Sequence, residues 1–109
     1  MKQITKEIKK FKLTDETIQF YCYTLHRIQA LIDFSDVKAG DLGGWIENEN
    51  NLSQSGNAWV YDDAKVFINA EVSGNAKVFD NAEVFGWAKI GGNAKVGGNA
   101  MVGGKTIIC

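Results

Sequence analysis

Aliphatic residues occupy every sixth position through the second half of the chain. The series is Val60, Val66, Val72, Val78, Val84, Ile90, Val96, Val102 and Ile108. Alanine stands two positions before each of the first eight, and the residue between is usually charged, as with Lys65 and Glu71. Residues two apart point to the same side of an extended strand, so the alanine and the aliphatic residue face inward together. A fixed period this short predicts a solenoid of strands, because an α-helix cannot keep a six-residue spacing on one face.

Glycine, asparagine or aspartate separates one unit from the next, so the repeat reads (G/D)-N-A-x-V-x. Asn57, Asn69 and Asn75 are examples of the asparagine. These residue types tolerate left-handed backbone angles, and they predict a corner in the chain every six residues. The late glycine pairs, such as Gly91-Gly92, keep the same spacing, which favours corners over a phosphate-binding loop.

This repeat resembles the motif of the hexapeptide-repeat superfamily, which Val96-Gly97-Gly98-Asn99-Ala100-Met101 matches in full. The resemblance implies an all-β fold, the left-handed parallel β-helix, in which three units make one triangular coil. The number of units then gives about three coils. Residues three units apart would stack, which places Lys65 over Glu83 and Glu71 over Lys89. Opposite charges on adjacent strands favour this register.

The first 45 residues lack the repeat. Residues 8–13 and 17–23 flank the turn-like Thr14-Asp15-Glu16 and predict a β-hairpin. Residues 25–34 put apolar side chains on alternate positions and predict a third strand, with a helix as the alternative.

We therefore expect two parts, a small N-terminal β cap of residues 1–45 and a β-solenoid of residues 46–109. The solenoid would begin with two weaker units at Ile46 and Leu52, followed by an insertion of two residues. An open end of a strand stack must be covered, and Trp45 and Trp59 are expected to anchor the cap on the first coil.

Composition and charge exclude several classes of protein. The 109 residues suffice for one domain, and a net charge of −1 gives no electrostatic case for direct nucleic-acid binding. No run of about 18 apolar residues is present, so no membrane contact is expected. The basic N-terminal run is not followed by the apolar segment of a secretory signal, which indicates a cytoplasmic protein. Cys22 and Cys109 are expected to be free thiols there, with a disulfide as the alternative.

The best-known members of the superfamily are acyltransferases, and the resemblance implies a catalytic histidine on the solenoid or on a loop from it. The single histidine of this chain, His26, lies outside the repeats. The three zinc-binding histidines of the related carbonic anhydrases are not available either. We therefore expect no catalysis, no metal and no cofactor. A small acyltransferase that binds acyl-coenzyme A is the alternative.

Aromatic residues follow several of the aliphatic positions and would stack in short columns on the outside of the solenoid. The candidate protein-interaction residues are Tyr61, Phe67, Phe79, Phe85 and Trp87. Exposed aromatic groups usually mark a partner site. The alternative is that they support the corners or pack under the N-terminal segment.

The end of the repeat region predicts self-association, because the last coil would present an unpaired edge and the end of an aliphatic core. The candidate residues for end-to-end stacking are Met101, Val102, Thr106, Ile107 and Ile108. A second copy of the chain is the simplest cover, so a homodimer is expected.

Binding without catalysis is therefore the predicted function, and the protein partner is not identified by the sequence. The chain also resembles short YdcK-like and prophage-type proteins with N-A-x-V repeats. That likeness suggests a phage-encoded inhibitor of a host defence protein, for instance an anti-CRISPR protein. The alternative function is that of a small acyltransferase of the hexapeptide-repeat superfamily.

Overall fold

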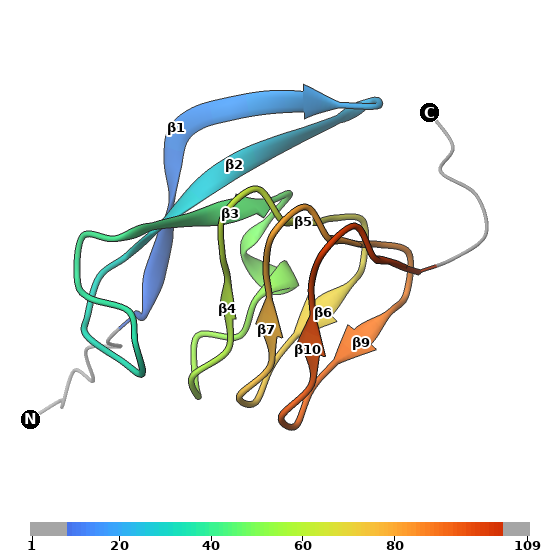
Figure 1. Cartoon of the computed structure of the whole chain (residues 1–109). Helices are drawn as coiled ribbons and strands as arrows, with labels where there is room; N and C mark the ends of the chain where they lie inside the picture. The colour runs from blue at the N-terminus through green and yellow to red at the C-terminus, as the bar shows by residue number, and fades with distance from the viewer. Residues whose placement is uncertain (1–8, 104–109) are drawn as a thin grey trace, which may run out of the picture.

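A computed structural model describes residues 9–103 as a parallel β-solenoid of about three turns that continues an antiparallel hairpin (Figure 1). The strands are β1 (Phe11–Phe20), β2 (Tyr23–Ala30), β3 (Leu42–Ile46), β4 (Trp59–Val60), β5 (Lys65–Val66), β6 (Glu71–Val72), β7 (Lys77–Val78), β8 (Glu83–Val84), β9 (Lys89–Ile90), β10 (Lys95–Val96) and β11 (Met101–Val102). One 3-10 helix, η1, covers Glu49–Asn51. The all-β solenoid expected from the repeat is confirmed, and its left-handed sense stays a prediction.

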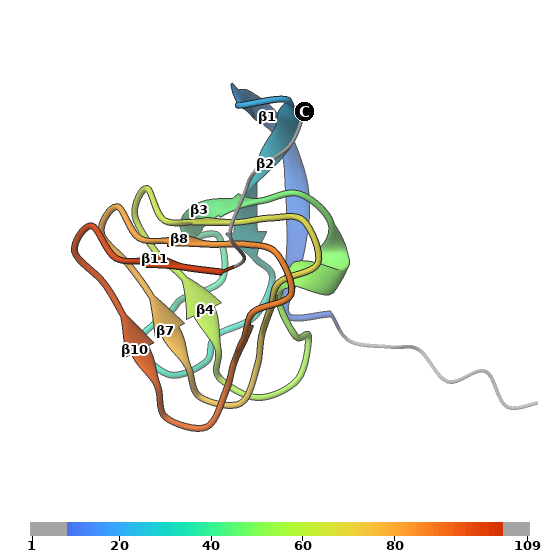
Figure 2. The same ribbon diagram turned by 90° about the vertical axis from the view of Figure 1, so that its right-hand side faces the viewer.

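Three stacks of parallel strands form the three sides of the solenoid, which Figure 2 shows from its end. One side contains β3, β5, β8 and β11, the second contains β4, β7 and β10, and the third contains β6 and β9 with a bridge from Leu52. The aliphatic residues stack as Ile46–Val66–Val84–Val102, Val60–Val78–Val96 and Leu52–Val72–Ile90. They fill the interior with the alanines, and most are fully buried.

The corners of the solenoid fall where the sequence predicts them. A residue with positive φ occurs every sixth position, at Gly56, Asp62, Ile68, Gly74, Asp80, Gly86, Gly92 and Gly98. Glycine and aspartate adopt this conformation at little cost, but a β-branched residue does not. Ile68, with a φ of 62°, is therefore the strained corner of the series.

The two pairs of opposite charges lie in the predicted register, but only one of them forms an ion pair. Glu71 lies opposite Lys89, and their side chains are 3.4 Å apart. Lys65 lies opposite Glu83, yet its ammonium group donates to the carbonyl of Asp63 and sits 5.0 Å from the ring centre of Phe20. One carboxylate oxygen of Glu83 is buried without a hydrogen-bond partner among residues 9–103.

The N-terminal hairpin is present, but its turn is not where the sequence indicated. The chain reverses at Tyr21 and Cys22, and Thr14-Asp15-Glu16 is an irregularity inside β1. The hydroxyl of Thr14 donates to the carbonyl of Arg27 and accepts from the amide of Glu16, so this polar segment is satisfied without a reversal. The helix alternative for residues 25–34 is wrong, because residues up to Ala30 belong to strand β2.

Strand β3 connects the hairpin to the solenoid. It pairs antiparallel with β2 on one edge and parallel with β5 on the other, so the expected boundary at residue 45 falls inside one continuous sheet. Two glycines permit the close packing of β3 on the first coil. A Cβ atom on Gly43 would lie 2.6 Å from the carbonyl oxygen of Val60, and one on Gly44 would lie 2.6 Å from that of Ala64.

The two-residue insertion before β4 fastens the start of β1 to the first coil. Leu52 bridges to Val72, and this spacing is two positions longer than that of regular stacked pairs such as Val60 and Val78, which confirms the insertion. The ammonium group of Lys10 is buried and donates to the carbonyls of Ser55, Gly56 and Ala58. Desolvation by burial lowers the pKa of Lys10 to about 8.

Tryptophans anchor the hairpin on the solenoid as expected. Trp59 is buried and contacts the rings of Phe11 and Phe34 edge-on, while Trp45 lies under the guanidinium group of Arg27 at 4.3 Å. Cys22 is disulfide-bonded, so the expectation of a free thiol at this position is wrong. Cys109 lies outside the described residues.

Candidate functional site

Two of the five candidate interaction residues are buried under the hairpin. Phe67 and Phe85 stack with ring centres 5.6 Å apart, as their separation by one coil predicts. Phe20 and Tyr23 from the hairpin cover Phe67, with ring centres 5.5 Å away in each case. The hairpin thus turns this aromatic column into a second hydrophobic cluster, and its packing leaves little surface for a partner.

The second aromatic column is half-buried at another corner. The hydroxyl of Tyr61 donates to a carboxylate oxygen of Asp36 at 2.8 Å. Burial and this carboxylate raise the pKa of Tyr61 above its ordinary value. Phe79 lies against Gly97, where a Cβ atom would be 2.1 Å from its ring. The glycines of the last coil therefore make room for aromatic rings of the coil before it.

Trp87 is the fifth candidate and the most exposed large apolar residue described, at 78%. It occupies a position that asparagine holds in most other units, one coil after Asn69. Two depressions in the surface meet at its side chain, one apolar and one polar.

The apolar depression lies at the end of the solenoid and has a volume of about 300 Å³. Trp87, Ala88, Val102 and Gly103 line it. Met101, which precedes Val102 in strand β11, is 61% exposed. We call these five residues the end surface. Thr106, Ile107 and Ile108, the other candidates for end-to-end stacking, lie outside the described residues.

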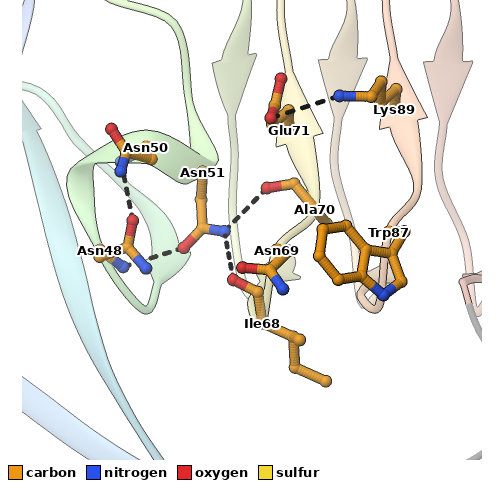
Figure 3. Close-up of a pocket in the computed structure, with 9 residues that line it drawn as sticks. All are labelled: Asn48, Asn50, Asn51, Ile68, Asn69, Ala70, Glu71, Trp87 and Lys89. Atoms are coloured by element: carbon orange, nitrogen blue, oxygen red, sulfur yellow. Dashed lines mark hydrogen bonds and ion pairs between the residues drawn. The ribbon is translucent and has the colours of Figure 1, made fainter.

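The polar depression, of about 380 Å³, runs from η1 to Trp87 across the third side of the solenoid (Figure 3). The residues that line it are Asn48, Asn50, Asn51, Ile68, Asn69, Ala70, Glu71, Trp87 and Lys89. We call it the asparagine depression, because four of the nine are asparagines.

Asn51 forms the rigid floor of the asparagine depression. It is 1% exposed, and its amide makes four hydrogen bonds. The side-chain oxygen accepts from the backbone amides of Glu47 and Asn48, at 3.0 and 2.9 Å. The side-chain nitrogen donates to the carbonyls of Ile68 and Ala70, at 3.3 and 2.8 Å. The side-chain amide of Asn51 therefore makes all of its hydrogen bonds within the protein, and these bonds join η1 to the coil that contains Ile68 and Ala70.

The strained corner at Ile68 is held from both sides. A carboxylate oxygen of Glu47 accepts from its backbone amide at 2.7 Å, and Asn51 donates to its carbonyl. The Ile68 side chain packs against the cluster of Phe67 and Phe85. A strained residue that its surroundings fix in this way is typical of functional sites.

The rim of the depression carries groups that can bind a ligand. The side chains of Asn50 and Asn69 are exposed and make no hydrogen bond to any residue that the structure describes. Glu71 and Lys89 form their ion pair at the edge of the depression, at the top of the view in Figure 3. The rim therefore combines free amides, a neutralised charge pair and a large aromatic surface.

Sequence reasoning found Trp87 but missed the asparagines opposite it. Asn48, Asn50 and Asn51 precede the regular repeats, and their role depends on contact with a segment of the following coil. The run Asn48-Glu49-Asn50-Asn51 was a possible signal. It holds more amide side chains than the repeat requires, since a repeat unit needs only one small residue there. Periodicity alone could not place that run beside Trp87.

Catalytic candidates lie away from both depressions. Nδ1 of His26 is 3.2 Å from the carbonyl oxygen of Thr14 in the hairpin, and no depression described above includes it. Between residues 9 and 103, no group of three or more metal-binding side chains comes together. Nor does that part of the chain form a helix of the length and apolarity needed to cross a bilayer.

The fold and the repeat are consistent with the hexapeptide-repeat superfamily. The chain is 40% identical over 63 residues to a protein named "Uncharacterized acetyltransferase YdcK" from Escherichia coli (strain K12). The match covers 50% of this chain and only 19% of the relative. No protein-family model matches the chain.

Proposed function

We propose that this chain is a non-catalytic interaction module that pairs with a second copy of itself through the end surface. The observation that carries the proposal is the apolar depression lined by Trp87, Ala88, Val102 and Gly103, together with the exposed Met101 of the same last strand. Contiguous exposed apolar groups of this kind usually mark a site of association.

The state of the last coil supports the same proposal. Ala76 and Ala82 are fully buried, whereas Ala94 and Ala100, one coil later, are exposed. Within residues 9–103, the interior column is thus left open at this end. A second copy that stacks on it would bury these groups and would provide partners for the backbone of the last strands. The expected assembly is a two-fold symmetric dimer.

Light scattering of the purified protein over a range of concentrations tests the proposal. We expect a dimer for the natural sequence and a monomer for Met101→Glu, because pairing would bury two added charges without partners. Leu31→Glu is the matched control, since Leu31 is also an exposed aliphatic residue, at 41%, but lies beside the start of β1. A monomeric natural protein, or a dimer that persists in Met101→Glu, would contradict the proposal.

A protein partner of another kind is part of the same proposal, with Trp87 as its anchor and the cytoplasm as its compartment. The more specific version, a phage-encoded inhibitor of a host defence protein, rests on the resemblance seen in the sequence. It predicts that the purified chain blocks a defence enzyme in an activity assay and that Trp87→Ala does not.

A second candidate function is a small acetyltransferase, and the similarity to the relative named as an acetyltransferase favours it. This candidate predicts that acetyl-coenzyme A binds to the purified protein in a calorimetric titration. Binding that accompanies a trimer in light scattering would favour the enzyme over the interaction module.

A further inference from the structure

We propose that the asparagine depression binds a neutral sugar, with the apolar face of one pyranose ring stacked on Trp87 and its hydroxyls bonded to the amides of the rim. This inference is distinct from self-association, although Trp87 lines both the asparagine depression and the apolar depression of the end surface.

The aromatic part of the argument rests on the exposure of Trp87. Trp45 and Trp59 are 5% and 1% exposed, so their rings serve the interior, whereas Trp87 keeps 78% of its surface in water. A large ring left in water on the wall of a depression offers a flat apolar surface to a ligand. The ring faces of pyranoses carry C–H groups and match such a surface.

The polar part of the argument rests on the free amides. Asn50 and Asn69 each offer one acceptor and two donors, and neither side chain is engaged within residues 9–103. A hydroxyl group also donates and accepts, so neighbouring hydroxyls of a sugar can bond an amide at both ends. The carboxylate of Glu71, which also lines the depression, adds a further acceptor.

The charges of the depression favour a neutral ligand over a phosphorylated one. Its one ammonium group, on Lys89, is paired with Glu71 at 3.4 Å. The ammonium group of Lys89 has donors left for a phosphate, but such a phosphate would lie beside the carboxylate of Glu71 and would be repelled by it. A neutral ring keeps the pair intact.

The depression exists before any ligand arrives. The four hydrogen bonds of Asn51 fix η1 against the second coil, and Glu47 and Asn51 hold the backbone of Ile68 on both sides. Preformed sites lose less free energy to ordering when they bind. The volume of about 380 Å³ lies in the lower part of the range for small-molecule sites.

Nuclear magnetic resonance of the natural protein tests the inference with four probes: glucose, galactose, mannose and N-acetylglucosamine, each titrated to tens of millimolar. We expect at least one probe to shift the indole N–H signal of Trp87 and the side-chain amide signals of Asn50 and Asn69. The indole signals of Trp45 and Trp59 are internal controls and should not move.

Three variants complete the test. Trp87→Ala should abolish the shifts of the amide signals, and Asn69→Ala should weaken binding about tenfold, in line with the loss of a ligand hydrogen bond. Tyr21→Ala is the matched control, because Tyr21 is an aromatic residue 59% exposed at the hairpin turn, and it should leave binding unchanged.

Several outcomes would overturn the inference. They are the absence of shifts with all four probes, shifts that persist in Trp87→Ala, and shifts with glucose 6-phosphate alone. Self-association is judged separately. Asn69→Ala should keep the oligomeric state of the natural protein, and Met101→Glu should keep the sugar-induced shifts.

Discussion

Val78→Ala and Val96→Ala remove the same two methyl groups from one interior column, at different depths. Val78 lies between Val60 and Val96 and is fully buried. Val96 lies one coil later and is only half-buried. The pair of variants therefore measures how the stability of the solenoid changes towards the last coil that the structure describes.

The expected costs follow from burial. Two methyl groups at about 0.8 kcal/mol each give about 1.6 kcal/mol for Val78→Ala. The cavity left in a closed interior raises the loss in free energy of unfolding to about 2–3 kcal/mol. At Val96 part of the side chain already meets water and the site can relax, so the expected loss is about 1 kcal/mol.

Urea unfolding followed by far-UV circular dichroism measures both values, at protein concentrations where light scattering reports monomers. At higher concentrations, stacking of a second copy should bury Val96 and bring its cost towards that of Val78. A loss below about 1 kcal/mol for Val78→Ala would refute the reasoning, because the removal of two methyl groups from a close-packed interior costs more than that. Equal losses at all concentrations would show that the last coil is not open.

Three further predictions concern the contacts that hold the parts together. Asn51→Ala should lower the free energy of unfolding by about 2–4 kcal/mol, because it leaves buried backbone groups unpaired; urea unfolding measures it, and Asn50→Ala should cost little. The pKa of Lys10 is about 8 in the folded chain and 10.5 without burial, so the unfolded chain holds more protons between these values and the free energy of unfolding should rise with pH. Lys10→Met should remove that rise in unfolding experiments at pH 8 and 10. Gly43→Ala should weaken the junction of β3 with the first coil, since its Cβ would lie 2.6 Å from a carbonyl oxygen; a melting temperature equal to that of the natural protein would contradict this.

The solenoid could be predicted because each six-residue unit determines its own local structure and the same unit is repeated along the chain. A single unit such as Asn75-Ala76-Lys77-Val78 contains a corner, two inward residues and one outward residue. Repetition then fixes the register, and the pairing of Glu71 with Lys89 agrees with it.

The hairpin and the asparagine depression could not be predicted in the same way. Thr14-Asp15-Glu16 has the composition of a turn, but the carbonyl of Arg27 on the facing strand satisfies the Thr14 hydroxyl and β1 continues. Phe67 has an outward position in its repeat, and only the distant hairpin covers it. Contacts between segments far apart in sequence decide these features, and periodicity does not report them.

The antiparallel pairing of β2 with β3 has a consequence for assembly beyond one pair of chains. Strand stacks whose two ends are both free can add copies without limit and grow into filaments. Here β2 occupies the outer edge of β3, on one of the three sides of the first coil, so incoming chains find no parallel template on that side. In the dimer proposed above, the two end surfaces would cover each other, and β2 would block extension of the sheet that contains β3 at the opposite end.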